Sequence, residues 1–171
     1  LYMNKALESA RDDKGLIASV LNKMATLELA YGNLTLSEEL FERALKHAKE
    51  ADNLQLQIDV IAQKAAVHRR MGNLDTAREY LSTALAYYEK SGSKRLQSRC
   101  LNDLAELDRF AGNYADAEAG YLKALHLKSA LGDQRFFVAS LNLGIVYAET
   151  DRPVEARGEL ERACLLYTSP S

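Results

Sequence analysis

The strongest constraint on the fold of this chain is an internal repeat with a period of about 40 residues. The segments Gly32-Asn33-Leu34, Gly72-Asn73-Leu74 and Gly112-Asn113-Tyr114 follow one another at a constant spacing. In each copy a small residue, a large apolar residue and an alanine follow at constant distances from the glycine. These are Ser37, Phe41 and Ala44; Ala77, Leu81 and Ala84; Ala117, Tyr121 and Ala124; and, in a fourth copy shortened by one residue, Ala156, Leu160 and Ala163. Such periodicity predicts a stack of identical supersecondary units.

Each unit is predicted to be two helices joined by a tight turn. The glycine can adopt a positive φ and so end the first helix. The asparagine after it can serve as the N-cap of the second helix, with its side chain accepting from a free N–H. Ala25, Ala65 and Ala105 provide a small residue on the first helix, so the two helices of each unit can pack closely. The first helix of the fourth copy fits the full spacing through Leu141 and a spacing one residue shorter through Leu143-Gly144.

Composition supports a purely helical fold. The 171 residues include two prolines, hydrophobic residues make up 47% and charged residues 27% of the chain, and good helix formers dominate. No stretch alternates in the manner of a β-strand. We therefore expect an all-α fold.

The repeat motifs resemble those of the tetratricopeptide repeat family, with Leu143-Gly144, Tyr147, Ala156, Leu160 and Ala163 as the best match. The period of this family is usually about 34 residues, so the chain is similar to the longer-helix arrays of bacterial regulatory ATPases, kinesin light chains and polarity scaffolds. The tryptophan common early in the first helix is absent, and Leu21, Ile61 and Leu101 occupy its position. The resemblance implies a right-handed α-solenoid of about nine helices whose first helices line a concave groove.

The expected organisation is a single array. Its parts are 1–11 as the last helix of a preceding repeat, followed by repeats at 16–51, 54–91, 95–131 and 134–167. The expected first helix lacks the other helix of its hairpin, and no polar capping helix follows the apolar residues near the C-terminal end of the sequence. We therefore expect a segment of a longer protein or an array that pairs with a second copy.

The groove is the expected binding site. Asn22, Asn102 and Asn142 recur at whole multiples of the repeat period, and an asparagine can donate to and accept from a peptide backbone. In related arrays such a series holds an extended peptide; the alternative is that these side chains are solvated or bond to neighbouring helices. The full set of expected groove residues is Asn22, Thr26, Arg69, Arg70, Arg99, Asn102, Arg109 and Asn142.

The four arginines of this set favour an acidic ligand, because guanidinium groups match carboxylates in shape and charge. Asp59, Asp103, Glu106 and Asp108 lie on the same helices and could instead pair with the arginines. An acidic segment or a chain terminus is the ligand that follows if the arginines are available. Salt-bridged surface is the other interpretation.

Other functions find little support in the sequence. The formal net charge of -2 argues against direct nucleic-acid binding, and no apolar run is long enough to cross a membrane. Three histidines and two cysteines lack metal-ligand spacing, and no phosphate-binding loop occurs. We expect no catalytic residue, metal or cofactor, and Cys100 and Cys164 as buried thiols of a cytoplasmic protein.

The expected function is therefore a non-catalytic scaffold that binds a protein or an extended, acidic peptide and is part of a larger protein. The alternative is an oligomerisation or effector-sensing segment of a bacterial signalling or transcription regulator. A homodimer formed through the terminal repeats fits either function.

Overall fold

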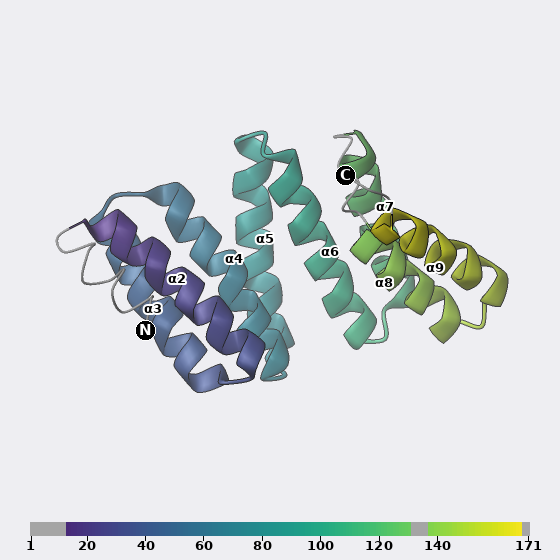
Figure 1. Cartoon of the computed structure of the whole chain (residues 1–171), viewed down its shortest axis with the longest axis horizontal. Coiled ribbons are helices and arrows are strands. Elements are labelled where there is room, and N and C mark those ends of the chain that lie inside the picture. The colour runs from purple at the N-terminus through teal and green to yellow at the C-terminus, as the bar shows by residue number, and fades with distance from the viewer. Residues whose placement is uncertain (1–12, 131–136, 169–171) are drawn as a thin grey trace. The chain divides into compact units, whose positions relative to one another are not determined.

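The computed structural model describes residues 13–130 and 137–168, and these form eight α-helices without a β-strand (Figure 1). The helices are α2 (Lys14–Tyr31), α3 (Leu34–Glu50), α4 (Leu54–Arg70), α5 (Leu74–Lys90), α6 (Lys94–Phe110), α7 (Tyr114–Ala130), α8 (Phe137–Glu149) and α9 (Pro153–Thr168). The expected all-α fold is confirmed. The helix expected within residues 1–11 lies outside the described residues. None of the helices described is long and apolar enough to cross a membrane.

The chain divides into two compact units, residues 1–84 and 85–171. The first unit contains α2, α3, α4 and the beginning of α5. The second contains the end of α5 and the hairpins α6–α7 and α8–α9. Each unit has its own packed interior and is described separately below.

The hairpin turns follow the predicted glycine chemistry. Gly32, Gly72 and Gly112 have φ values of 86°, 83° and 78°, in the left-handed region that glycine enters without a steric penalty. In the fourth hairpin Asp151 takes this place with a φ of 57°, and short polar residues tolerate the region better than other side chains.

The asparagine caps follow the prediction only in part. Asn33 occupies the N-cap position of α3, but its side chain makes no capping hydrogen bond, so the prediction of a side-chain cap was wrong there. Instead, Asn33 Nδ2 donates to Glu28 Oε2 at 2.7 Å. The Asn33 side chain thus bonds to the last turn of the preceding helix, α2, rather than to a backbone N–H of α3.

The interior of the first unit lies between α2, α3 and α4. Its buried residues are Leu21, Ala25, Leu40, Phe41, Ala44, Val60 and Val67. The small residue predicted at the helix crossing, Ser37, is fully buried together with its hydroxyl. Its Oγ donates a hydrogen bond to the Ala25 carbonyl at 2.7 Å. Burial without such a partner would cost about 1–3 kcal/mol.

The interior of the second unit also relies on small residues at the crossings. Its buried residues are Ala105, Ala117, Tyr121, Leu125, Ala139, Leu143, Val146, Tyr147 and Ala156. A Cβ on Gly144 would lie 3.2 Å from the Ala156 carbonyl oxygen and 2.9 Å from Leu160 Cγ. Gly144 thus sits at the crossing, as Ala25 does beside Ser37, and the fourth repeat follows the shorter spacing. The missing residue lies between α7 and α8.

Adding one methyl group at the crossing of α6 and α7 should destabilise the second unit. In Gly120→Ala the new Cβ would lie 2.8 Å from Ala105 Cβ and 3.4 Å from its Cα, so the helices would have to separate. We expect a loss of about 1–3 kcal/mol in the free energy of unfolding, measured by urea denaturation.

The matched control is Gly158→Ala, which adds a methyl group to α9 with no atom within 4 Å. It should stabilise the helix by about 0.5–1 kcal/mol. Ala105→Gly combined with Gly120→Ala should recover part of the loss. A Gly120→Ala protein as stable as the parent would contradict the packing of this hairpin.

Candidate functional site

The candidate site consists of the neighbouring first helices within each unit. In the second unit, α6 and α8 lie side by side and are joined by polar contacts between residues 40 positions apart. Arg109 Nη1 lies 2.8 Å from Glu149 Oε1, and Asn142 Nδ2 lies 3.4 Å from Asn102 Oδ1. In the first unit, Thr26 of α2 donates to Gln63 Oε1 of α4 at 2.7 Å.

The two asparagines of the second unit bond to each other. Asn102 also donates to Asp103 Oδ1 at 3.3 Å, so both of these hydrogen bonds are at the long end of the usual range. Both side chains are half-buried. The sequence left open whether these side chains bind a peptide, or are solvated or bonded to neighbouring helices. In the structure they bond to each other between two neighbouring helices. Weak bonds of this kind can be exchanged for bonds to a ligand.

The shorter spacing shifts the asparagine series in the fourth repeat. Counted from the hairpin crossing, Leu141 is the equivalent of Asn102, and Asn142 is the equivalent of Asp103. Leu141 is 42% exposed. The regular recurrence of Asn142 in the sequence therefore does not reflect an equivalent place in the hairpin, although its side chain still reaches Asn102.

Asn22 of the first unit is more deeply buried than the two asparagines of the second unit. Asn22 is 8% exposed, and its Oδ1 has no hydrogen-bond partner among the described residues. The hydroxyl of Thr26 also lies 2.9 Å from the Asn22 carbonyl oxygen, so its single proton is shared between that oxygen and Gln63. An unpaired buried acceptor is costly, and contact between Asn22 and a ligand stays a prediction.

The four predicted arginines differ in their availability. Arg109 pairs with Glu149 and stacks over the Phe110 ring at 4.7 Å. Arg70 Nη1 donates to the Leu29 carbonyl. Arg69 is half-buried, and Arg99 is exposed. Arg69 and Arg70 belong to the first unit, and Arg99 and Arg109 belong to the second.

A buried charge cluster in the first unit was not identified from the sequence. Lys64 is 4% exposed, and its Nζ contacts Glu42 and lies 3.0 Å from Glu38 Oε1 and 5.3 Å from the centre of the Tyr80 ring. His68 Nε2 lies 3.3 Å from the same Glu38 oxygen. Lys64 itself could have indicated this cluster in the sequence, because the equivalent residues in the other first helices are methionine and leucine.

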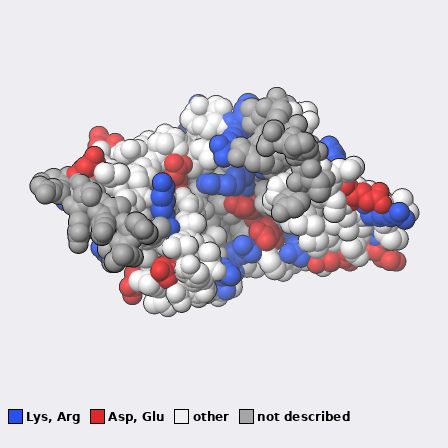
Figure 2. All heavy atoms as spheres, viewed as in Figure 1, with Lys and Arg blue, Asp and Glu red and all other residues white. Residues whose placement is uncertain are grey.

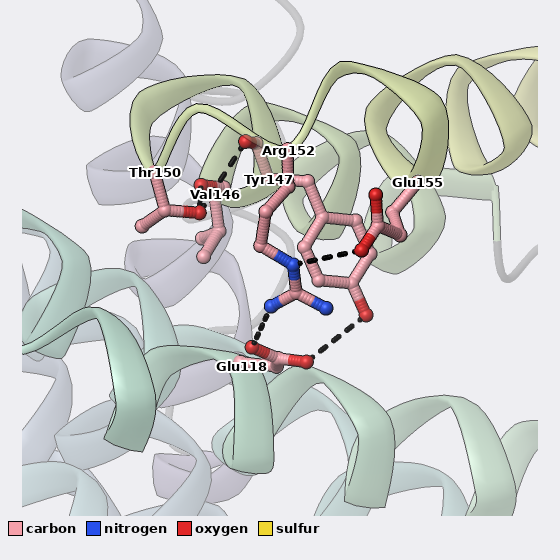
Figure 3. Close-up of polar contacts among 6 residues, drawn as sticks. All are labelled: Glu118, Val146, Tyr147, Thr150, Arg152 and Glu155. Atoms are coloured by element: carbon pink, nitrogen blue, oxygen red, sulfur yellow. Dashed lines mark hydrogen bonds and ion pairs between the residues drawn. The ribbon is translucent and has the colours of Figure 1, made fainter.

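The second unit has a related polar contact between α7 and the α8–α9 hairpin (Figure 3). Glu118 accepts hydrogen bonds from the Tyr147 hydroxyl at 3.1 Å and from Arg152 Nη1 at 2.7 Å. The guanidinium carbon of Arg152 lies 4.2 Å from the centre of the Tyr147 ring. Burial, together with the charge and hydrogen bond of Glu118, raises the pKa of Tyr147. Glu38 and Glu118 occupy the same place two repeats apart and hold the following hairpin through the equivalent residues His68 and Tyr147.

The described residues contain no group of three or more His, Cys, Asp or Glu side chains placed to hold a metal ion. Cys100 is buried as predicted, whereas the prediction for Cys164 was wrong, because this side chain is exposed on α9. It borders an apolar hollow between the end of α8 and α9 that is lined by Ala148, Pro153, Ala156, Leu160 and Leu165.

These features define an all-α solenoid of helical hairpins. Residues 54–130 match the family model described as tetratricopeptide repeat. A comparison with curated proteins found no match. The chain is thus a tetratricopeptide-like helical-repeat protein.

Solved structures share this fold at low sequence identity. BtubC (BKLC) from P. vanneervenii is 23% identical, with a TM-score of 0.81 over 99% of this chain and 72% of that one. A Rap protein complexed with Competence and Sporulation Factor is 17% identical, with a TM-score of 0.84 over 96% and 47%. RapI in its apo form is 14% identical, with a TM-score of 0.79 over 96% and 61%. The chain thus spans less than two thirds of either Rap protein.

Proposed function

We propose that this chain is a non-catalytic scaffold that binds a protein or an extended peptide across the faces of its first helices. The observation that carries the proposal is the pair Asn102 and Asn142, whose amides lie side by side on α6 and α8 and are held by long hydrogen bonds. A main chain offers both donors and acceptors, and these amides can pair with it without reading its sequence.

The fold gives this proposal general support. Helical-repeat proteins present extended surfaces for partner binding, and one structural neighbour is a Rap protein in complex with Competence and Sporulation Factor. The described residues lack a metal-binding cluster, and the polar clusters around Lys64 and Glu118 join neighbouring helices within a unit. We place the protein in the cytoplasm as an interaction module.

A triple change of Asn22, Asn102 and Asn142 to alanine should weaken peptide binding at least tenfold while the protein stays folded. The readout is binding to an array of synthetic decapeptides, with circular dichroism as the check on folding. Asn33→Ala is the matched control, because this exposed asparagine lies in a hairpin turn and bonds to Glu28. Full binding by the folded triple variant would refute the role of the asparagines.

A second candidate is an effector-sensing or oligomerisation segment of a bacterial signalling regulator, favoured by the likeness to the Rap protein with its bound factor. Light scattering across a concentration series separates the two. A monomer that binds peptides supports the scaffold, and a dimer formed without peptide supports the assembly segment.

A further inference from the structure

The N-terminal half of α6 carries a group of exposed cations. Lys94, Arg95 and Arg99 are exposed, and none of them has an ion pair with a residue that the structure describes. Figure 2 shows blue atoms gathered over this half of the helix and red atoms further along it. Arg109 and Arg152 of the same unit, by contrast, are neutralised by Glu149 and Glu118.

These cations share a face with the asparagine pair. Arg95, Arg99 and Asn102 follow one another at intervals of four and three positions, which places them on one stripe of an α-helix. The carboxylate-bearing residues Asp103 and Glu106 follow towards the C-terminal end. A ligand carboxylate would therefore be attracted to the N-terminal half of α6.

The neighbouring stripe on α8 is apolar. The contacts Asn102–Asn142 and Arg109–Glu149 fix the register of the two helices, so the beginning of α8 lies beside Arg99. Val138 and Leu141 are both 42% exposed there, and Ile145 continues the stripe. A basic strip on α6 thus lies next to an apolar strip on α8. The asparagines follow both strips towards the C-terminal ends of the two helices.

We infer that this α6–α8 face, formed by Arg95, Arg99, Asn102, Val138 and Leu141, binds an extended peptide segment in which a carboxylate side chain accompanies an apolar one. The inference rests on the proposed function and specifies its ligand. Arg95 and Arg99 bind the carboxylate, and Val138 and Leu141 contact the apolar side chain. A nucleic acid fits less well, because its phosphates are continuous and the exposed cations lie only on the N-terminal half of α6.

The geometry also sets a spacing within the ligand. Arg95 and Asn102 are two helical turns apart, or about 10 Å along the helix axis. An extended peptide covers this length in about three residues. The carboxylate should therefore lie about three residues from the part of the peptide that bonds to the asparagines.

The test uses synthetic decapeptides in matched pairs, each acidic member having a partner with Gln or Asn in place of Glu or Asp. The parent chain should bind acidic members more tightly, and the double variant Arg95→Gln with Arg99→Gln should lose about tenfold or more of that preference. The control is Arg43→Gln with Lys46→Gln, an equal change in net charge at exposed positions of α3. Leu141→Asn should separately reduce binding of peptides that carry leucine relative to those that carry alanine.

The outcomes separate the two proposals. If the parent chain binds peptides and the double variant keeps the preference for acidic members, the carboxylate site is refuted and the scaffold function stands. Equal losses in the double variant and the control would also refute the site, because net charge alone would explain them. If the parent chain binds no peptide of the array, both proposals fail.

Discussion

Replacement of Lys64 by methionine should lower the free energy of unfolding by about 2–4 kcal/mol. The Nζ of this nearly buried lysine contacts Glu38 and Glu42, and methionine would fill the volume but leave the Glu38 carboxylate without its nearest cation. The Glu38 side chain is 26% exposed but one of its oxygens is buried, so part of the charge left behind stays in a medium that solvates it poorly. Urea denaturation of the two proteins at pH 7 measures the difference.

The same substitution at Lys46 is the control, since this side chain is 76% exposed and lies 4.0 Å from Glu50. An exposed pair of this kind contributes at most about 1 kcal/mol. Adding Glu38→Leu to Lys64→Met should recover part of the loss. A Lys64→Met protein that matches the Lys46→Met protein in stability would show that the cluster contributes little.

Alkaline pH should not disturb the Lys64 cluster until far above neutrality. Burial alone would lower the pKa of Lys64, but the hydrogen bonds and charges of Glu42 and Glu38 together raise it. A raised lysine pKa means that the stabilisation is complete below the unfolded value, which is about 10.4. It is lost as the pH rises through the higher value of the folded state.

Tyr121 should make the second unit sensitive to alkali. Burial and the charge of Glu106 raise the pKa of this fully buried tyrosine to about 12, against a smaller opposing effect of Arg109. The folded state then holds its phenolic proton more tightly than the unfolded state, whose pKa is about 10. Stability is therefore present below pH 10 and lost as the pH rises towards 12. Between pH 9 and pH 11 the loss from this group is about 1 kcal/mol, and by pH 12 about 2 kcal/mol.

Tyr121→Phe isolates this contribution, because other groups also ionise in this range. The variant should lose less stability than the parent between pH 9 and pH 11, by about 1 kcal/mol. Urea denaturation at the two pH values gives the comparison. Equal losses in the two proteins would mean that the hydroxyl of Tyr121 titrates alike in the folded and unfolded states.

The fold could be predicted because its determinants repeat. Regularly spaced glycines mark the turns, and Ala25 and Ala105 mark crossings where helices approach closely, so each hairpin repeats the evidence of the others. The place of the one-residue deletion could not be predicted, because an apolar helix such as α8 has leucines that fit two spacings. Packing of Gly144 against the Ala156 carbonyl decides between them.

The site was predicted less completely. Arginines were recognised by type, but their availability depends on partners in other helices, such as Glu149 for Arg109 and the Leu29 carbonyl for Arg70. Those pairings join residues a whole repeat apart and depend on side-chain conformations. Lys64 was visible as an exception within an apolar series, yet only the packed structure shows that two glutamates neutralise it.

The deletion before α8 has a consequence for the evolution of specificity. One residue corresponds to about 100° of helix rotation, so a helix that kept the spacing of the other repeats would have turned its interior residues away from the core. Leu141 replaces an asparagine at the equivalent position, while Leu143, Gly144 and Val146 keep their places in the interior. Packing thus fixes which residues a hairpin offers to a ligand, and a single-residue insertion or deletion between hairpins leaves both the core and that set of residues unchanged.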